Sequence, residues 1–260
     1  MPLFMHSFEF ANMPEQVRKM DRLYVAYGWD LTLGHLPESD VTQAIVKKWV
    51  EAAVPNGAPV CIDLEPSSAQ PWAYNTDARM RPINSVVREV DRVRGVMQGL
   101  SDHVGWKGFY NMPFYRDAYM HLADRRRERR AHMAAVKSLG LHELSTHVSF
   151  DVYRFGEATD GDCDRSLEIN IDEARAAYPD KPIWAWVSAW RNVTKGNIWV
   201  PPDLLKKDIE RLATKLKPAI GDRIVWWGPR TYESSPGVWA QQPWNPKWAW
   251  VPVFESTLGR

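Results

Sequence analysis

Two carboxylates separated by one residue end an apolar segment of the chain. The segment "PVCIDLEP" runs from Pro59 to Pro66 and carries Asp63 and Glu65 at its far end. Residues i and i+2 of a β-strand point to the same side, so a strand here places both acids on one face with Cα atoms about 6–7 Å apart. Carboxylates this close perturb each other, which favours one proton donor beside one charged group near neutral pH. Such a pair is suited to general acid catalysis, which cleavage of a glycosidic bond requires.

A structural role for the same two acids is the alternative. Asp63 would then support a loop, and Glu65 would form an ion pair with Arg79 or Arg81. The D-x-E pattern alone is common, so its position decides between the two interpretations. It is followed by Pro66 and the long loop "SSAQPWAYNTDARMRP", and long loops in compact domains are usually functional or mobile. We therefore expect Glu65 and Asp63 to be catalytic.

The elements that must position these acids alternate along nearly the whole chain. Strand-like segments cover residues 3–8, 23–29, 58–65, 105–111, 145–153, 182–190 and 223–229, with 248–254 as an eighth. Helical patterns between them cover residues 41–54, 83–100, 116–140 and 201–218. Asp40 is the expected N-cap of the first of these helices. Alternating strands and helices are typical of βα units on a parallel sheet.

Both a doubly wound sheet and a closed barrel are built from such units. Three observations favour the barrel: seven or eight similar units, no glycine-rich phosphate turn after the first strand, and polar or aromatic residues at most strand ends. The predicted fold class is α/β, a TIM-type (β/α) barrel of seven or eight strands that need not be regular or complete. Without a visible linker or repeat, we expect a single domain over residues 1–260.

The other strand ends carry residues suited to bind a sugar. They are Tyr110 in the fourth segment, Asp151 and Tyr153 on one face of the fifth, Trp186 in the sixth and Trp227 in the seventh. In TIM-type barrels the active site is assembled from the carboxyl ends of the strands. Aromatic rings combine a large apolar face with low entropy cost, and carboxylates and phenols accept hydroxyl hydrogens. We expect these five residues to bind substrate.

The order of these motifs resembles the hyaluronidase family of glycoside hydrolases. The motifs are "IDLE", "GWKGFYNMPFY", "SFDVY", "KPIWAWVSAW" and "DRIVWWGPRTY", spread over about residues 58–232. The resemblance implies that Glu65 is the general acid. It implies that Asp63 orients the N-acetyl group of the substrate, whose carbonyl oxygen attacks the anomeric carbon. It also implies that Tyr110 and Trp227 border the acetamido pocket.

The chain departs from the family pattern directly after the acid pair. Pro66 and Ser67 stand where the family carries a second acid and a tryptophan. The function we expect is hydrolysis of a polysaccharide or glycan containing N-acetylhexosamine, with substrate-assisted retention and without a cofactor. One alternative is a non-catalytic carbohydrate-binding or structural barrel, such as a virion or cell-surface component. Another is a glycosidase with Asp151 as a conventional nucleophile, its carboxyl group about 5–5.5 Å from that of Glu65.

Composition narrows the partners and the compartment. The formal net charge is +1, which argues against a protein built to bind nucleic acid. No segment has the length and apolar character of a membrane span, and no signal peptide is visible at the N-terminus. Cys61 and Cys163 form no disulfide framework, which favours either synthesis in the cytoplasm or a chain from which a leader has been removed, and the compartment stays open. The sequence leaves the oligomeric state open.

Two charged runs and the tryptophans complete the pattern. The run "DRRRERR" (124–130) predicts a solvated helix face rather than a patch for nucleic acid or an anionic polysaccharide. The run "DGDCD" (160–164) predicts an acidic surface turn, because it lacks the glycine and the terminal glutamate of a calcium loop. No histidine or cysteine spacing predicts a metal site. Of the 14 tryptophans we expect most in the core.

Overall fold

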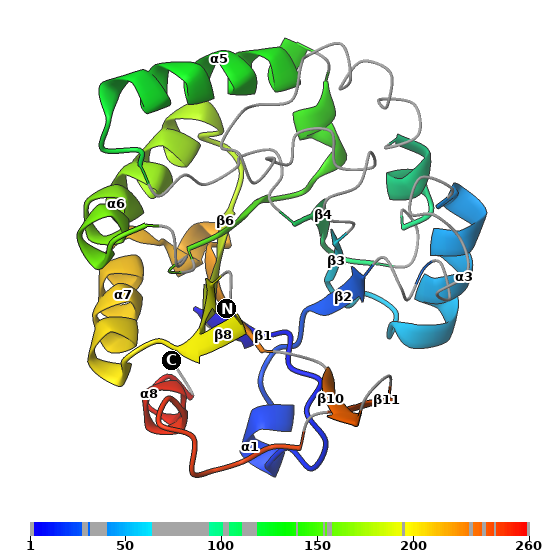
Figure 1. The fold of residues 1–260 in the computed structure, drawn as a ribbon. Coiled ribbons are helices and arrows are strands. Elements are labelled where there is room, and N and C mark those ends of the chain that lie inside the picture. The colour runs from blue at the N-terminus through cyan, green and yellow to red at the C-terminus, as the bar shows by residue number, and fades with distance from the viewer. Residues whose placement is uncertain are drawn as a thin grey trace.

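Parallel β-strands occupy the centre of the computed structural model, and helices surround them (Figure 1). The structure describes residues 3–27, 31, 41–63, 94–100, 104–110, 119–138, 140–152, 154, 158–193, 196–228, 231–235, 238–241 and 243–258. The central strands are β1 (Phe4–His6), β2 (Tyr24–Tyr27), β3 (Val60–Asp63), β4 (Lys107–Phe109), β5 (Val148–Asp151), β6 (Ile183–Ser188) and β9 (Arg223–Trp227). Each lies inside one of the seven predicted segments, so the mixed α/β class with parallel strands is confirmed.

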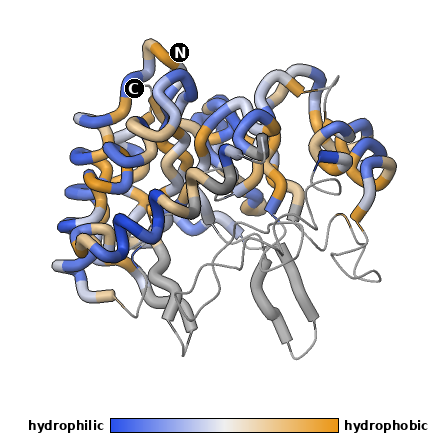
Figure 2. Tube along the Cα trace, turned by 90° about the horizontal axis from the view of Figure 1, so that it is seen from above, coloured by the Kyte–Doolittle hydropathy of each residue, from blue (hydrophilic) through white to orange (hydrophobic). Residues whose placement is uncertain are grey.

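The helices have one apolar face toward the strands and one polar face outward, and hydrophilic and hydrophobic turns alternate along them in Figure 2. They are α1 (Glu15–Arg18), α3 (Gln43–Ala53), α5 (Ala123–Ser138), α6 (Asp160–Ala177), α7 (Pro202–Lys215) and α8 (Val251–Glu255), with short 3₁₀ turns at Leu141–Leu144 and Pro218–Ile220. Within the described residues, no helix combines the length and the apolar character needed to cross a membrane.

The described strands form two parallel sheets rather than one continuous sheet. Their orders are β1-β9-β6-β5 and β2-β3-β4. Beside β1, a parallel bridge joins His6 to Arg22, and the amide of Leu23 donates to the carbonyl of His6 at 2.8 Å. Beside β4, the amide of Thr146 donates to the carbonyl of Lys107 at 2.9 Å. These contacts bring the outer strands of the two sheets together at both seams, although the described residues form no full ladder there.

Alternate residues of the central strands face two different apolar environments, as the period of two requires. Val60 and Ile62 of β3 pack against Val46 and Val50 of α3. Cys61, one residue out of phase, belongs to a second cluster that collects residues from both sheets. That interior cluster consists of Met5, Leu23, Val25, Cys61, Tyr110, Trp184, Trp186 and Val225, with Trp106 and Trp227 partly buried against it. The predicted division of the third strand into a helix-facing set and an interior set is thus correct for these residues.

Several elements differ from the sequence predictions. The segment 248–254, predicted as a strand, overlaps α8, because an all-apolar run fits a short buried helix as well as a strand. Helix α3 is capped by Thr42, whose hydroxyl accepts from the amide of Ile45, rather than by Asp40. Two antiparallel hairpins were not predicted: β7 (Trp190–Val193) with β8 (Gly196–Trp199), and β10 (Thr231–Ser235) with β11 (Val238–Gln241).

The basic run of α5 is only partly a solvated face. Arg127 pairs with Asp124 and is well exposed, as predicted. Arg130 forms an ion pair with Glu173 of α6, so part of its charge is offset by a neighbouring helix. Arg129 contradicts the prediction, because it is 2% exposed. The run therefore has three kinds of residue: one that is exposed to solvent, one that pairs with α6 and one that is buried.

Candidate functional site

Five of the seven residues predicted to form the site lie in the described part of the chain. Asp63 ends β3 and is partly buried. Tyr110 directly follows β4, and Asp151 ends β5. The sixth and seventh predicted strands contribute Trp186 and Trp227. Glu65 and Tyr153 lie outside the described residues.

The register of β3 and β4 brings Asp63 and Tyr110 to the same edge of their sheet. Ile62 is paired with Phe109, and the amide of Tyr110 donates to the carbonyl of Ile62 at 2.9 Å, so Asp63 and Tyr110 lie at adjacent positions on neighbouring strands. The backbone of Tyr27 on β2 is paired with that of Asp63, a neighbour that the sequence analysis did not single out. All of these positions are at the carboxyl ends of parallel strands, where TIM-type barrels carry their active sites.

A hydrogen bond connects two of the predicted residues across the seam between β4 and β5. The hydroxyl of Tyr110 donates to Oδ2 of Asp151 at 3.1 Å. Tyr110 is 6% exposed and Asp151 is 2% exposed. A buried carboxylate is costly unless it receives hydrogen bonds, so this contact is one reason why Asp151 is tolerated at the strand end.

Trp186 of β6 packs against the Tyr110 side of this pair. Its indole ring lies edge-on to the ring of Tyr110, with centroids 5.1 Å apart and planes at 73°. Its Nε1 donates to the hydroxyl of Ser149 on β5 at 2.8 Å. Trp186 is 1% exposed and belongs to the same interior cluster as Tyr110. Trp227 is less buried and packs against the same interior cluster.

Two glycines in the motifs are explained by close packing around the strand ends. A Cβ on Gly108, in the "GFY" motif, would lie 2.6 Å from the hydroxyl of Ser145 and 2.9 Å from the ring of His147. A Cβ on Gly228, after the two tryptophans of β9, would lie 2.7 Å from the ring of Phe10. Both distances are too short for any side chain, so glycine lets neighbouring segments approach at these points.

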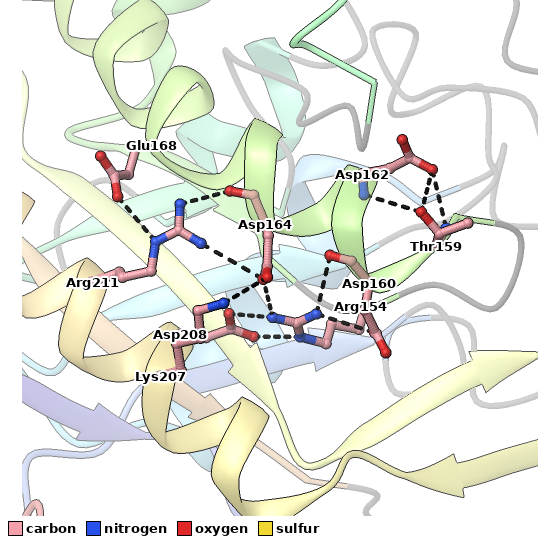
Figure 3. Close-up of polar contacts among 9 residues, drawn as sticks. All are labelled: Arg154, Thr159, Asp160, Asp162, Asp164, Glu168, Lys207, Asp208 and Arg211. Atoms are coloured by element: carbon pink, nitrogen blue, oxygen red, sulfur yellow. Dashed lines mark hydrogen bonds and ion pairs between the residues drawn. The ribbon is translucent and has the colours of Figure 1, made fainter.

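An ion-pair network follows β5 directly, and the sequence analysis missed it. Arg154 is 2% exposed and donates to both oxygens of Asp208 on α7, at 2.6 and 2.7 Å (Figure 3). It also donates to Asp164 at 2.6 Å and to Asp160 at 3.1 Å, both on α6. Although burial opposes it, the hydrogen bonds and charge of Asp208 and Asp164 raise the pKa of Arg154. The network ties the segment after β5 to two helices.

The acidic run 160–164 forms the start of helix α6, so the prediction of a surface turn is wrong. Thr159 is the N-cap: its hydroxyl accepts from the amide of Asp162 at 3.1 Å, and the Asp162 carboxylate accepts from the amide of Thr159 at 3.2 Å. Acidic side chains in a first turn also interact favourably with the helix dipole. The T-x-x-D pattern was the signal that would have predicted this start.

The arrangement at the strand ends can form hydrogen bonds to a polar ligand. It combines carboxylates, a phenol and indole rings, which suits hydroxyl and amide groups carried on an apolar ring. Among the described residues, no group of three or more histidine, cysteine or acidic side chains is arranged to hold a metal ion.

Comparison with known proteins relates the fold to that of solved crystal structures. No protein-family model and no curated protein sequence matches the chain. A crystal structure of bee venom hyaluronidase in complex with a hyaluronic acid tetramer aligns with a TM-score of 0.53 and 13% identity, covering 87% of this chain and 90% of that chain. A monoclinic crystal structure of bee venom hyaluronidase aligns with a TM-score of 0.49 and 12% identity, covering 81% and 80% of the two chains. The first alignment shows a shared overall fold.

Proposed function

We propose that this protein is a glycoside hydrolase acting on a polysaccharide or glycan that contains N-acetylhexosamine. One observation carries the proposal: Asp63, Tyr110 and Asp151 meet at the carboxyl ends of neighbouring strands, in a fold shared with bee venom hyaluronidase. That neighbour was crystallised with a hyaluronic acid tetramer. Its fold is known to accommodate a polymer of this class, which supports a saccharide as the ligand here.

The proposed mechanism divides the work between two acids. Glu65 protonates the glycosidic oxygen of the leaving group as the bond to the anomeric carbon breaks. The carbonyl oxygen of the substrate's own acetamido group attacks that carbon, with Asp63 orienting the group and stabilising the positive charge that develops on it. Water then opens the cyclic intermediate and gives its proton to Glu65, so the anomeric configuration is retained.

The contacts of Asp151 favour substrate assistance over a conventional enzyme nucleophile. A nucleophilic carboxylate needs an oxygen that can reach the anomeric carbon, whereas Asp151 is 2% exposed and accepts the hydrogen of Tyr110. The same acid is better suited to hold a neighbouring group. This supports the acetamido oxygen as the attacking atom.

Replacement of the proposed acid tests the function directly. Glu65→Gln removes the transferable proton and should lower kcat by about 10²–10⁴-fold, the usual contribution of general acid catalysis. The measurement is release of reducing ends from hyaluronan and chitin oligosaccharides. Glu51→Gln, the same change on an exposed face of α3, is the control and should leave turnover unchanged. Near-wild-type turnover by Glu65→Gln would end the proposed mechanism, and binding without any turnover by the wild type would favour a non-catalytic binding protein.

A further inference from the structure

One tryptophan of the β7-β8 hairpin is exposed to solvent. Trp199, the last residue of β8, has 41% of its surface accessible. Among the described residues, the large apolar side chains that are exposed are those of Leu122, Trp199 and Ile220, so Trp199 is the one aromatic ring among them. An indole combines a large apolar face with few rotatable bonds, which makes an exposed one suited to bind a flat apolar surface.

Buried rings support Trp199 from the inside of the molecule. Its ring is stacked on that of Trp250, with centroids 6.4 Å apart and planes at 26°, and lies 5.7 Å from the ring of the partly buried Trp248. Trp250 is 1% exposed, and Trp248 is itself stacked on it with centroids 5.7 Å apart. A ring packed in this way loses little conformational freedom when a ligand covers its exposed part. Trp199 is therefore a preformed surface.

The backbone places Trp199 next to the carboxyl end of β6. The amide of Val200, the residue after Trp199, donates to the carbonyl of Ala189 at 2.8 Å. Ala189 directly follows Ser188, whose register partner on β9 is Trp227. The hairpin thus leaves and rejoins β6 at the level of Trp227, one of the residues expected to bind substrate. Trp199 lies on the same side of the sheets as the candidate site.

Aromatic contacts lead from that level to Trp199. Gly228 follows Trp227 and lies so close to Phe10 that an added Cβ would be 2.7 Å from the Phe10 ring. The Phe10 ring lies 5.3 Å from the ring of Trp248, which contacts Trp199. Two ring-to-ring contacts therefore connect Trp199 to the end of β9. This places Trp199 at the rim around the strand ends, within reach of a chain molecule that extends outward from them.

The size of the surface favours a sugar over a protein as its occupant. The rings that contact Trp199 are themselves buried or partly buried, and the turn before Trp248 presents Asn245 and Lys247 to solvent. A stable protein interface buries about 800 Å² on each partner and needs several large apolar side chains. One indole face with an amide and an ammonium group nearby instead matches one pyranose ring, which has an apolar C–H face and hydroxyl groups around it.

We propose that Trp199 is a saccharide-binding platform at this rim, which holds a part of the polysaccharide chain beyond the sugar that is cleaved. The inference rests on the proposed function, because it takes a polymer of N-acetylhexosamine as the ligand. The C–H face of one pyranose ring stacks on the exposed part of the indole. An oligosaccharide short enough to occupy the strand ends alone does not reach Trp199, so the platform contributes to the binding of longer chains only.

Binding of oligosaccharides of two lengths tests this role. N,N′-diacetylchitobiose and chitohexaose are titrated calorimetrically into proteins that all carry Glu65→Gln, so that the chains stay uncut. Adding Trp199→Ala should weaken binding of chitohexaose about tenfold, as expected for loss of one aromatic contact, and leave binding of the disaccharide unchanged. Ile220→Ala is the control, because it truncates an exposed apolar side chain before the amino end of β9, and it should bind both sugars like its parent. Equal losses for both lengths would contradict a position beyond the cleaved sugar.

A fluorine label reports the contact directly and does not depend on the folding of Trp199→Ala. When 5-fluorotryptophan replaces all 14 tryptophans, the resonance of Trp199 is the one that is absent from Trp199→Phe. Saturating chitohexaose or hyaluronan hexasaccharide should shift this resonance, whereas N,N′-diacetylchitobiose should not. Trp199→Phe keeps an aromatic face and should bind chitohexaose more tightly than Trp199→Ala. A Trp199 resonance that does not move at saturation with either hexasaccharide would overturn the inference.

The outcomes separate the platform from the proposed function. If Trp199→Ala binds chitohexaose as tightly as its parent, the platform is wrong, while release of reducing ends by the wild type and its loss in Glu65→Gln still establish hydrolysis. If long chains bind through Trp199 and the wild type releases no reducing ends, hydrolysis is wrong and the platform stands. Failure to bind either hexasaccharide would overturn the platform.

Discussion

Gly108 lies where β4 approaches the segment that leads into β5 closely. Its missing side chain leaves room for the hydroxyl of Ser145 and the ring of His147, and that ring stacks on Trp184 with centroids 3.8 Å apart. Two residues later comes Tyr110, whose hydroxyl must reach Asp151 across the same seam. A single residue without a side chain thus allows the approach on which the site depends.

A methyl group at this position should be costly. We expect Gly108→Ala to lower the free energy of unfolding by about 1–3 kcal/mol, because the added Cβ overlaps packed atoms. Gly95→Ala is the matched control: that glycine is helical, and an added Cβ there meets nothing within 4 Å, so the change should stabilise by about 0.5–1 kcal/mol. Urea unfolding of both variants checks the pair, and equal effects would show that the crowding at Gly108 is not real.

Part of the site could be predicted at this scale. The period of two in a strand predicted that Cys61 turns away from the helices, and the motif order predicted that Asp63, Tyr110 and Asp151 lie at strand ends. The hydrogen bond between Tyr110 and Asp151 could not be predicted, because it joins residues 41 apart and depends on the spacing of two strands. No local pattern contains that distance.

The start of helix α6 was not predicted from the sequence. Its first five residues include Asp160, Asp162 and Asp164, and such a run without a partner favours a turn. Asp160 and Asp164 pair with Arg154 before the helix, and Asp164 also pairs with Lys207 and Arg211 of α7. The sequence does not indicate these partners, because they meet only where α6 and α7 lie side by side. Figure 3 shows the contacts between the two helices. Strands β1 to β6 and β9, whose signals are local, were predicted well.

Removing the buried arginine should destabilise this pair of helices strongly. Burial raises the pKa of Asp208, and Arg154→Met would leave that carboxylate without its main partner, so we expect a loss of about 3–5 kcal/mol in the free energy of unfolding. Lys215→Met, which removes an ion pair with Asp172 on the solvent side of the same helices, should cost less than about 1 kcal/mol. Thermal and urea unfolding measure both. A loss at Arg154 as small as that at Lys215 would contradict a structural role for the network.

The buried apolar residues described in the molecule form three clusters. One cluster fills the space between the strands of the two sheets, and two others pack the strands against the helices. Trp184, Trp186, Trp226 and Trp250 are fully buried, as expected for most tryptophans, whereas Trp199 is 41% exposed. The hairpins β7-β8 and β10-β11 lie outside the two parallel sheets. Their strands are four or five residues long, too short for the alternation to be distinguished from a loop.

Two buried histidines should make the stability of the whole fold depend on pH. Burial lowers the pKa of His147 to about 3 and that of His6 to about 4. In the unfolded chain both titrate near the ordinary value of about 6.5. The unfolded state therefore binds more protons below about pH 6.5, and stability falls as the pH falls. Each histidine contributes a slope of about 1.4 kcal/mol per pH unit, which ends near its folded pKa.

Replacing one histidine isolates its share of this slope. His147→Gln cannot titrate, so between about pH 6 and pH 4 its stability should fall less steeply than that of the wild type, by about 1.4 kcal/mol per pH unit. Urea unfolding at several pH values measures the two slopes, with pH 7.5 as the reference where neither imidazole is charged. Parallel curves for variant and wild type would show that His147 is not kept neutral by the fold.

The bond from Tyr110 to Asp151 crosses the seam between β4 and β5, where the described residues form no full ladder of backbone hydrogen bonds. Tyr110 and Asp151, which we expect to bind substrate, therefore also connect the two sheets. A substitution of either residue that changed the sugar specificity would also remove this contact between the sheets. A sequence with stability to spare can accept such a substitution more readily.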